Sequence, residues 1–459
     1  MTAIITDPFK HNTIEVLFND VTSTADSDQY YIGIGKSDTY DSSDTIATPL
    51  RTMFEERVAR GNLESIKKIT ASSFVVTRNN WSSGTIYSAW NDKQVDYPTN
   101  PYYVLTEDNE VYICIQQSKS STGSANASTV KPSYTTAGVN VNEAFETSDG
   151  YRWKFLYSIS SGDATNFLTA GFQPTQRILI DSGSANAFQL LQLNVQNNAI
   201  GGQIIGAEIV GAGSGFTSAP TLTFRGNGTA AAATATISGG AIVKVEMNNE
   251  SAGLGSGYDY ASIDITGGGG SGATLRPIIG PRDGFGFDAR KDLKSSSLMS
   301  NIKPAGDESG KFNITNDFRQ IIVLKNLDYT DSSSEGGRFG DLTEKVNRNM
   351  TLTQDISTTG FAVDEIITGG TSGVTARIDE VDSNAGFSIR FHQNENTING
   401  NFQDGEALTG NLGGTGTIDS GNLFSPVDIY SGDLLYIENR ARIIRSSSQT
   451  EDIKVILTV

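Results

Sequence analysis

The side chains best suited to chemistry at neutral pH are two histidines, because imidazole is the group that ordinarily titrates there. His11 and His392 are about 380 positions apart, and each lies among polar residues. A metal site or a histidine general base would therefore have to be assembled across domains. The sequence favours two surface histidines and predicts neither a metal ligand nor a catalytic base.

Neighbouring carboxylates are the second candidates, since paired acids can hydrolyse glycosides. Such neighbours occur at Glu55-Glu56, at Glu107-Asp108 and at Asp364-Glu365. Adjacent residues point to opposite faces of a strand and lie about 100° apart on a helix, so these spacings do not produce a facing pair. We expect solvated surface charges and no catalytic residue.

Two glycine strings invite comparison with phosphate-binding loops. GAGSGF (211–216) and GLGSGY (253–258) have the wrong spacing for a dinucleotide loop, and neither has the lysine that a phosphate-binding loop needs. Nor does GGGGSGATL (267–275) have the aspartate of calcium-binding nonapeptide repeats. We interpret these glycines as hairpin turns and expect no cofactor.

Composition narrows the function classes further. Thirty-four basic and 52 acidic residues give a net charge of −18, which disfavours nucleic-acid binding. The single cysteine, Cys114, excludes an internal disulfide or a cysteine metal cluster and is expected in the core. The N-terminus does not resemble a signal peptide, and no run of about 18 apolar residues occurs, so we expect neither conventional export nor a membrane span.

The clearest helix pattern lies at about 49 to 60. Thr48 can cap the first amides, Pro49 suits the first helical position, and Gly61 suits the end. Apolar residues then recur at helical spacing, which predicts an inward apolar face: Leu50, Met53, Phe54 and Val58.

Period-two patterns predict several strands. In EVYICIQQ (110–117) both alternating sets are apolar, so this strand should be covered on both sides. In RWKFLYSI (152–159), Trp153, Phe155, Tyr157 and Ile159 should share one face, with Arg152, Lys154 and Ser158 largely on a solvated one.

The remaining ordinary segments predict two more strands and a helix. RQIIVLKN (319–326) is typical of a buried strand, and DLTEKVNR (341–348) of a short helix. The last run, DIKVILTV (452–459), alternates as a strand, and a strand at a terminus usually completes a sheet built elsewhere.

Two glycine-rich stretches contain internal repeats. GSGFTSAP (213–220) returns as GSGYDYAS (255–262), with LTF (222–224) matched by IDI (263–265). Asn227-Gly228 and Gly239-Gly240 suit tight hairpins. EIITGGTSG (365–373) returns as EALTGNLGG (406–414), 41 residues on. Because a unit of about 40 residues buries too little surface to be stable alone, we expect paired copies to pack together.

These patterns predict an α+β, β-dominated fold, with a discontinuous mixed sandwich core and two inserted all-β modules. The expected parts are the N-terminal core (1–185), a first tandem-repeat module (186–281), a core continuation (282–350), a second repeat module (351–425) and C-terminal strands that complete the core (426–459).

The non-glycine segments resemble the dimeric baseplate wedge subunit of T-even-type and related cyanobacterial or marine contractile-tailed bacteriophages. The most specific similarity is GDLLYIENRARIIRSSSQTEDIKVILTV (432–459), which keeps the family's order of strand, E-N-R, I-I, Q-T-E and final strand. Further similar segments keep the family order: IGIGKSDTYDSSD (32–44), R-x-x-W (78–81), VYICI (111–115), DGYRWKFLYSI (149–159) and FRQIIVLKN (318–326). The two glycine-rich modules have no counterpart in the T-even version.

The resemblance implies a virion protein of the tail baseplate, made in the host cytoplasm, that forms a homodimer and binds other wedge subunits. It implies no enzyme activity. Candidate interface or core anchors are Trp81, Trp153, Tyr436 and Arg440, since aromatic and arginine side chains dominate interface centres. The alternative is a carbohydrate-binding or adhesive virion protein, whose glycine-rich modules contact the host surface. A hydrolase is a third and weaker interpretation.

Overall fold

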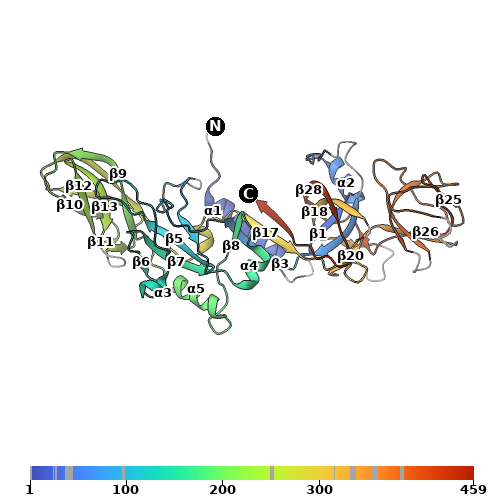
Figure 1. The fold of residues 1–459 in the computed structure, drawn as a ribbon, viewed down its shortest axis with the longest axis horizontal. Helices are drawn as coiled ribbons and strands as arrows, with labels where there is room; N and C mark the ends of the chain where they lie inside the picture. The colour runs from blue at the N-terminus through green and yellow to red at the C-terminus, as the bar shows by residue number, and fades with distance from the viewer. Residues whose placement is uncertain are drawn as a thin grey trace. The chain divides into compact units, whose positions relative to one another are not determined.

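The computed structural model describes residues 3–459 apart from 24, 26–27, 37–44, 96–98, 249–252, 315, 331–336, 354–359 and 383–386 (Figure 1). Strands dominate and the helices are short, which confirms the α+β, β-dominated class. The chain divides into two compact units. Unit 1 comprises Met1–Ile14, Ser73–Met299 and Leu457–Val459, and unit 2 comprises Glu15–Ser72 and Ser300–Ile456. Most of 32–44, one of the segments similar to the wedge family, lies outside the described residues.

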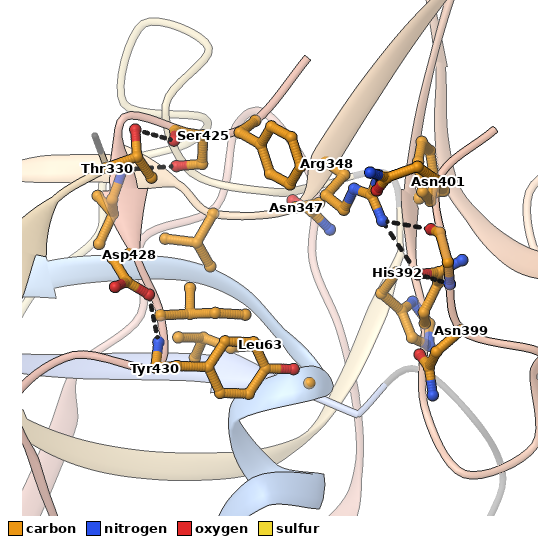
Figure 2. Close-up of a pocket in the computed structure, with 18 residues that line it drawn as sticks. Leu63, Thr330, Asn347, Arg348, His392, Asn399, Asn401, Ser425, Asp428 and Tyr430 are labelled. Carbon is orange, nitrogen blue, oxygen red and sulfur yellow. Dashed lines mark hydrogen bonds between the residues drawn. The ribbon is translucent and has the colours of Figure 1, made fainter. Parts of the chain in front are cut away.

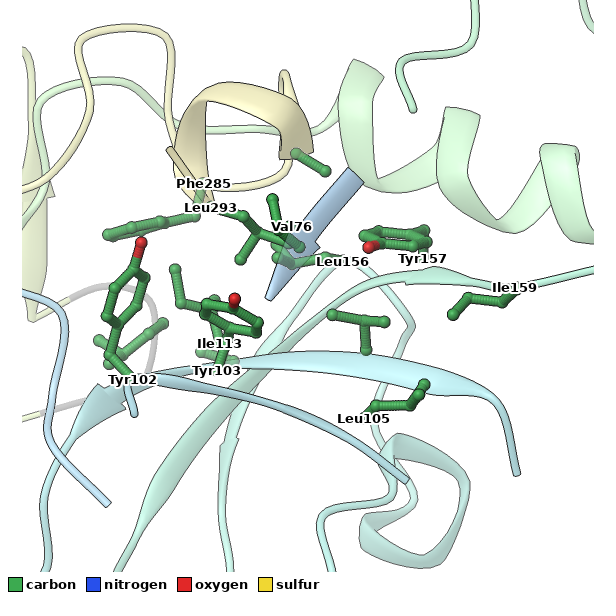
Figure 3. Close-up of a cluster of buried hydrophobic side chains, with 14 of the residues drawn as sticks. Val76, Tyr102, Tyr103, Leu105, Ile113, Leu156, Tyr157, Ile159, Phe285 and Leu293 are labelled. Carbon is green, nitrogen blue, oxygen red and sulfur yellow. The ribbon is translucent and has the colours of Figure 1, made fainter. Parts of the chain in front are cut away.

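A four-stranded antiparallel sheet forms the centre of unit 1. Its order is β4 (Tyr103–Leu105), β5 (Glu110–Gln116), β7 (Arg152–Ser158) and β6 (Ala144–Glu146). Val111, Ile113 and Ile115 pack into one hydrophobic cluster, whereas Tyr112 and Cys114 pack into another. Both faces of β5 are therefore covered, as predicted, and Cys114 is a core residue. Figure 3 shows Phe285 and Leu293 over Ile113 on one face of the sheet.

The neighbouring strand β7 corrects the prediction for 152–159. Its pairing with β5 shifts register between Val111 and Tyr112, so Trp153 and Phe155 join one cluster and Tyr157 joins the other. A register shift of this kind sends later side chains to the opposite face. The expected solvated face is also wrong, because Arg152, Lys154 and Ser158 are all buried.

The chain also forms several helices and a second four-stranded sheet. The helices include α1 (Asp7–Val21), α3 (Tyr134–Ala137), α4 (Ser161–Phe167), α5 (Ala187–Asn197) and α6 (Ala289–Asp292). Asn186 and Gln189 form a capping box at the start of α5, which packs on β7. The second sheet has the order β29 (Ile453–Thr458), β17 (Ser297–Ile302), β3 (Ala71–Thr77) and β8 (Phe172–Thr175). The last strand thus joins a sheet of distant segments, as predicted.

The first glycine-rich stretch folds into short sheets with their own apolar clusters. The strands are β9 (Ile204–Ser214) with β16 (Ser271–Ile279), β11 (Thr229–Ala231) with β14 (Leu254–Ser256), and a sheet of order β13 (Ala241–Met247), β12 (Ala233–Ser238), β10 (Thr221–Gly226) and β15 (Ala261–Thr266). The two repeats pair directly, with Leu222 opposite Ile265. Gly239 and Gly240, both at positive φ, form the predicted β12–β13 hairpin. Asn227-Gly228 is not a hairpin, because β10 and β11 pair with other strands.

Unit 2 is built on a five-stranded antiparallel sheet. Its order is β20 (Thr343–Lys345), β2 (Leu63–Lys68), β1 (Tyr30–Gly35), β18 (Asp317–Lys325) and β28 (Asp433–Ile444), and β19 (Asp328–Tyr329) pairs separately with β27 (Val427–Asp428). Strand β18 is buried, as 319–326 predicts. The helix expected at 341–348 is wrong, because that segment contributes β20 and the start of β21.

The second glycine-rich stretch closes into a six-stranded barrel around its own core. The order is β21 (Arg348–Leu352), β24 (Ser388–His392), β23 (Thr375–Asp382), β22 (Ile366–Gly369), β25 (Ala407–Gly410) and β26 (Thr415–Leu423). The two repeats contribute β22 and β25, which pair through Thr368 and Thr409. The two repeats thus pair with each other within one barrel, in line with the expectation that paired copies pack together.

Candidate functional site

Helix α2 (Met53–Gly61) begins later than predicted and turns its apolar face outward. Thr52, rather than Thr48, is the N-cap, and its side chain accepts a hydrogen bond from the Glu55 amide. The buried residues of the helix are Ala59 and Arg60. Met53 and Phe54 are 78% and 62% exposed, so the predicted inward face is wrong.

The segment before α2 and the first turn of the helix lie beside strand β28, the end strand of the sheet among the described residues. We define the α2–β28 surface as Leu50, Met53, Phe54, Leu435 and Tyr436. Leu50 is 63% exposed and Leu435 is 43% exposed. Between the segment before α2 and the start of β28 lies a groove of about 410 Å³, lined by Leu50, Tyr436 and their neighbours. Exposed apolar surface of this kind marks interaction sites in folded proteins.

Arg60 fixes the two halves of this surface to each other. Its guanidinium is 3% exposed and donates hydrogen bonds to the carbonyl oxygens of Ile429 (2.7 Å), Ser431 (2.8 Å) and Gly432 (2.9 Å). Its Nη2 is also 3.1 Å from Glu56 Oε1. Because one buried cation satisfies three carbonyls just before β28, the helix and the strand are held in a defined relation.

The four predicted anchors lie in different units. Tyr436 and Arg440 are on β28, where Tyr436 Oη donates to Glu438 Oε2 at 2.9 Å. Burial, aided by that carboxylate, raises the pKa of Tyr436 to about 12. Arg440 is 40% exposed, and its Nη1 is 3.9 Å from Glu438 Oε1. The strand therefore presents charges of both signs beside the apolar side chains.

The two predicted tryptophans belong to unit 1 and are held by its own core. Trp153 is fully buried in the cluster that also contains Tyr87, and the two rings meet edge to face at 5.6 Å. Trp81 is half-buried against the same cluster, and its Nε1 donates to Ser128 Oγ at 3.2 Å. Trp153 is therefore a core residue of this unit.

A second candidate site is a pocket of about 450 Å³ in unit 2 (Figure 2). Figure 2 shows Tyr430, Asp428 and Thr330 on one side, facing His392, Asn399 and Asn401 on the other. Its lining comes from distant segments: the end of α2, the link between β20 and β21, the loop after β24, and the chain from 424 to 430.

The sequence prediction missed this pocket, because its residues come together only in the fold. One signal was present in the loop QNENTINGN (393–401), which is unusually rich in side-chain amides. Amides both donate and accept hydrogen bonds, which suits recognition of a polar ligand.

Both histidines are buried, so the prediction of two surface histidines is wrong. His11 on α1 is 4% exposed and stacks on the Phe74 ring at 5.7 Å. His392 is 3% exposed, with Nδ1 at 2.6 Å from Asp379 Oδ1 and Nε2 at 3.2 Å from Asn394 Nδ2. Both ring nitrogens of His392 thus face protein groups, and the imidazole is a buried part of the pocket wall.

The neighbouring carboxylates differ in their surroundings. Glu107 and Asp108 are exposed and pair with Lys131, as expected for surface charge. Glu365 is instead fully buried, which corrects the expectation for that pair. Among the described residues, no group of three or more His, Cys, Asp or Glu side chains is arranged to hold a metal ion.

No protein-family model matches the chain, and no curated protein matches it significantly. Within the part of the chain that the structure describes, no helix is both long enough and apolar enough to span a membrane.

Proposed function

We propose that this protein is a structural subunit of a contractile phage tail baseplate, which forms a homodimer and joins other wedge subunits. The proposal is supported by where the segment most similar to the wedge family lies in the fold. That segment, 432–459, contributes β28 and β29. Strand β28 carries part of the α2–β28 surface, a group of exposed apolar side chains at the end of the sheet.

The α2–β28 surface suits a symmetric contact between two copies. A twofold interface places the same surface on both partners, so it must be complementary to itself. Leu50, Met53 and Phe54 provide apolar side chains for a dry centre. Glu438 and Arg440 lie two positions apart on the same strand, so antiparallel copies can place one opposite the other.

The net charge of −18 favours assembly with complementary partners over nonspecific self-association. Free copies repel one another at long range, and this repulsion is overcome only where local groups are complementary. A particle subunit benefits from this property, because it stays soluble until it meets its intended neighbour.

The location of the protein is tested by mass spectrometry of purified tails from the phage that encodes it. We expect the chain in the intact tail fraction, at a constant ratio to the other baseplate proteins across preparations. Its presence only in the particle-free fraction of infected cells would contradict the proposal. Recovery of the major tail tube protein serves as the control for intact particles.

A further inference from the structure

The pocket of Figure 2 has a lining that differs in kind from the α2–β28 surface. It combines partly exposed aromatic rings with amides: Phe424 is 53% exposed and Tyr430 is 62% exposed, and Asn399 and Asn401 stand on the wall opposite Tyr430. Its volume of about 450 Å³ lies within the usual range for small-ligand sites, roughly 300–1,000 Å³. The two features are separate, since the pocket and the groove at α2–β28 share no lining residue.

Arg348 holds one wall of the pocket in place. Its guanidinium lies over the Phe424 ring at 4.7 Å and over the Phe391 ring at 5.3 Å. Nη1 donates to Gln393 Oε1 (3.0 Å) and to the Gly400 carbonyl (2.9 Å), and Nη2 donates to Asn401 Oδ1 (2.8 Å). The asparagine-rich loop and the Phe424 ring are therefore ordered by the same cation before any ligand arrives, which reduces the entropy that binding must overcome.

The lining selects among ligand classes. Arg348 directs its Nη donors to protein oxygens, and Asp428 adds a negative charge, so a phosphate or carboxylate ligand is disfavoured. A wholly apolar ligand would leave the amides of Asn399 and Asn401 facing apolar atoms, which is costly. A neutral ring with hydroxyl groups and an apolar face suits this lining. Its apolar face packs against the aromatic rings, and its hydroxyls form hydrogen bonds with the amides.

We propose that this pocket binds a saccharide unit. The C–H face of the sugar ring packs against the Tyr430 and Phe424 rings, as apolar groups pack on aromatic faces. Its hydroxyls exchange hydrogen bonds with the amides of Asn399 and Asn401 and donate to the Asp428 carboxylate. This function is independent of the proposed assembly, since it needs no second copy of the chain.

Saturation-transfer-difference NMR of the full chain tests the proposal with free glucose, galactose, mannose and N-acetylglucosamine as probes. We expect transfer to the ring protons of at least one sugar. Tyr430→Ala and Asn399→Ala should each weaken that binding at least tenfold, because the first removes one of the two aromatic contacts and the second removes one of the two amides. Both side chains are exposed, so the variants should keep the wild-type thermal midpoint.

Tyr260→Ala is the matched control, since Tyr260 is a comparably exposed tyrosine (67%) of unit 1 and lies outside the pocket lining. It should leave the sugar signal unchanged. The proposal is overturned if none of the four sugars receives transfer. It is also overturned if transfer survives both pocket variants, or if Tyr260→Ala reduces it as much as they do.

Discussion

Glu365 and Glu406 hold equivalent places in the two repeats of the barrel, and the carboxylate of each caps the turn of the other repeat. Glu365 Oε1 accepts hydrogen bonds from the amides of Leu412 (2.9 Å) and Gly414 (3.0 Å). Glu406 Oε2 accepts from the amides of Thr371 and Ser372, both at 2.8 Å. Each repeat thus supplies the carboxylate that accepts hydrogen bonds from the turn of the other repeat.

The glycine four positions after each glutamate makes room for this exchange. A Cβ at Gly410 would lie 1.9 Å from Glu365 Oε1, and a Cβ at Gly369 would lie 2.6 Å from Glu406 Oε1. These positions thus require glycine because a buried carboxylate occupies the space of a side chain. The E-x-x-x-G spacing that both repeats share follows from this packing.

The first prediction concerns these glutamates. Glu365→Gln and Glu406→Gln should each lower the free energy of unfolding of the barrel by about 2 kcal/mol, because an amide replaces a charged acceptor of several backbone N–H groups. Urea denaturation of the full chain measures the effect. Glu395→Gln, at an exposed position of the same barrel, is the control and should change it by less than about 0.5 kcal/mol. Equal effects at all three positions would contradict the reciprocal capping.

The second prediction is that acid weakens the capping by Glu406, because protonation removes the charge of the accepting carboxylate. Burial raises the pKa of this carboxyl, but hydrogen bonds from Ser372, Gln403 and Thr371 outweigh it and hold the pKa below the usual 4.5. Its contribution to stability is therefore fully present above pH 4.5 and is lost as the pH falls through the lower folded-state value. Urea midpoints of the wild type and Glu406→Gln should converge as the pH is lowered through this range. A constant difference would rule out the assignment.

A buried pair in unit 1 should produce a stability minimum near pH 8. Burial raises the pKa of Asp292 to about 8 and lowers the pKa of Lys154 to about 8. The Asp292 contribution is present below its unfolded value and is lost as the pH rises to about 8. The Lys154 contribution is present above its unfolded value and is lost as the pH falls to about 8.

The variant Asp292→Asn tests the part of this pH dependence that lies below about pH 8, where the Asp292 carboxyl determines the change in stability. The asparagine keeps an oxygen that can accept from the Gly286 amide, a bond of 2.6 Å in the wild type, and has no proton to lose. Its free energy of unfolding relative to wild type should rise from about pH 4 to pH 8 and then stay constant. Thermal unfolding across this range measures the difference. A difference that is independent of pH would show that Asp292 is ionised in the folded state.

Arg60 should be essential to the geometry of the α2–β28 surface. Arg60→Ala removes the buried donor of three carbonyls and should lower the free energy of unfolding by about 3 kcal/mol. Arg57→Ala, on the exposed side of the same helix, should cost less than about 0.5 kcal/mol. Urea denaturation distinguishes the two variants, and similar losses for both would contradict this role of Arg60.

The predictions from sequence succeeded where burial on both sides leaves a continuous apolar run. Strands β5 and β18 are of this kind, because a strand buried on both faces has a nearly continuous apolar sequence. Strand β7 misled because a register shift moves Tyr157 to the other face, and such a shift leaves no periodic signal. Helix α5 was not predicted, although Asn186 and Gln189 have the spacing of a capping box in the sequence.

The sequence predicted the residues of the candidate sites less well than it predicted the buried strands. The residues at 50, 53 and 54 have the spacing of a core-facing helix, and the pattern cannot distinguish burial in the fold from burial by a partner. Glu365 and His392 were assigned to the surface by residue type, yet each is buried because local groups satisfy it. Such compensation depends on contacts between distant segments and is absent from any local pattern.

Sedimentation velocity of the purified full chain at ordinary salt tests most directly whether this is a wedge subunit that dimerises through the α2–β28 surface. We predict a dimer, with Phe54→Glu sedimenting as a monomer and Val210→Glu, at a comparably exposed position (60%) of unit 1, remaining a dimer. A monomeric wild type, large homopolymers, or a dimer unaffected by Phe54→Glu would contradict the account.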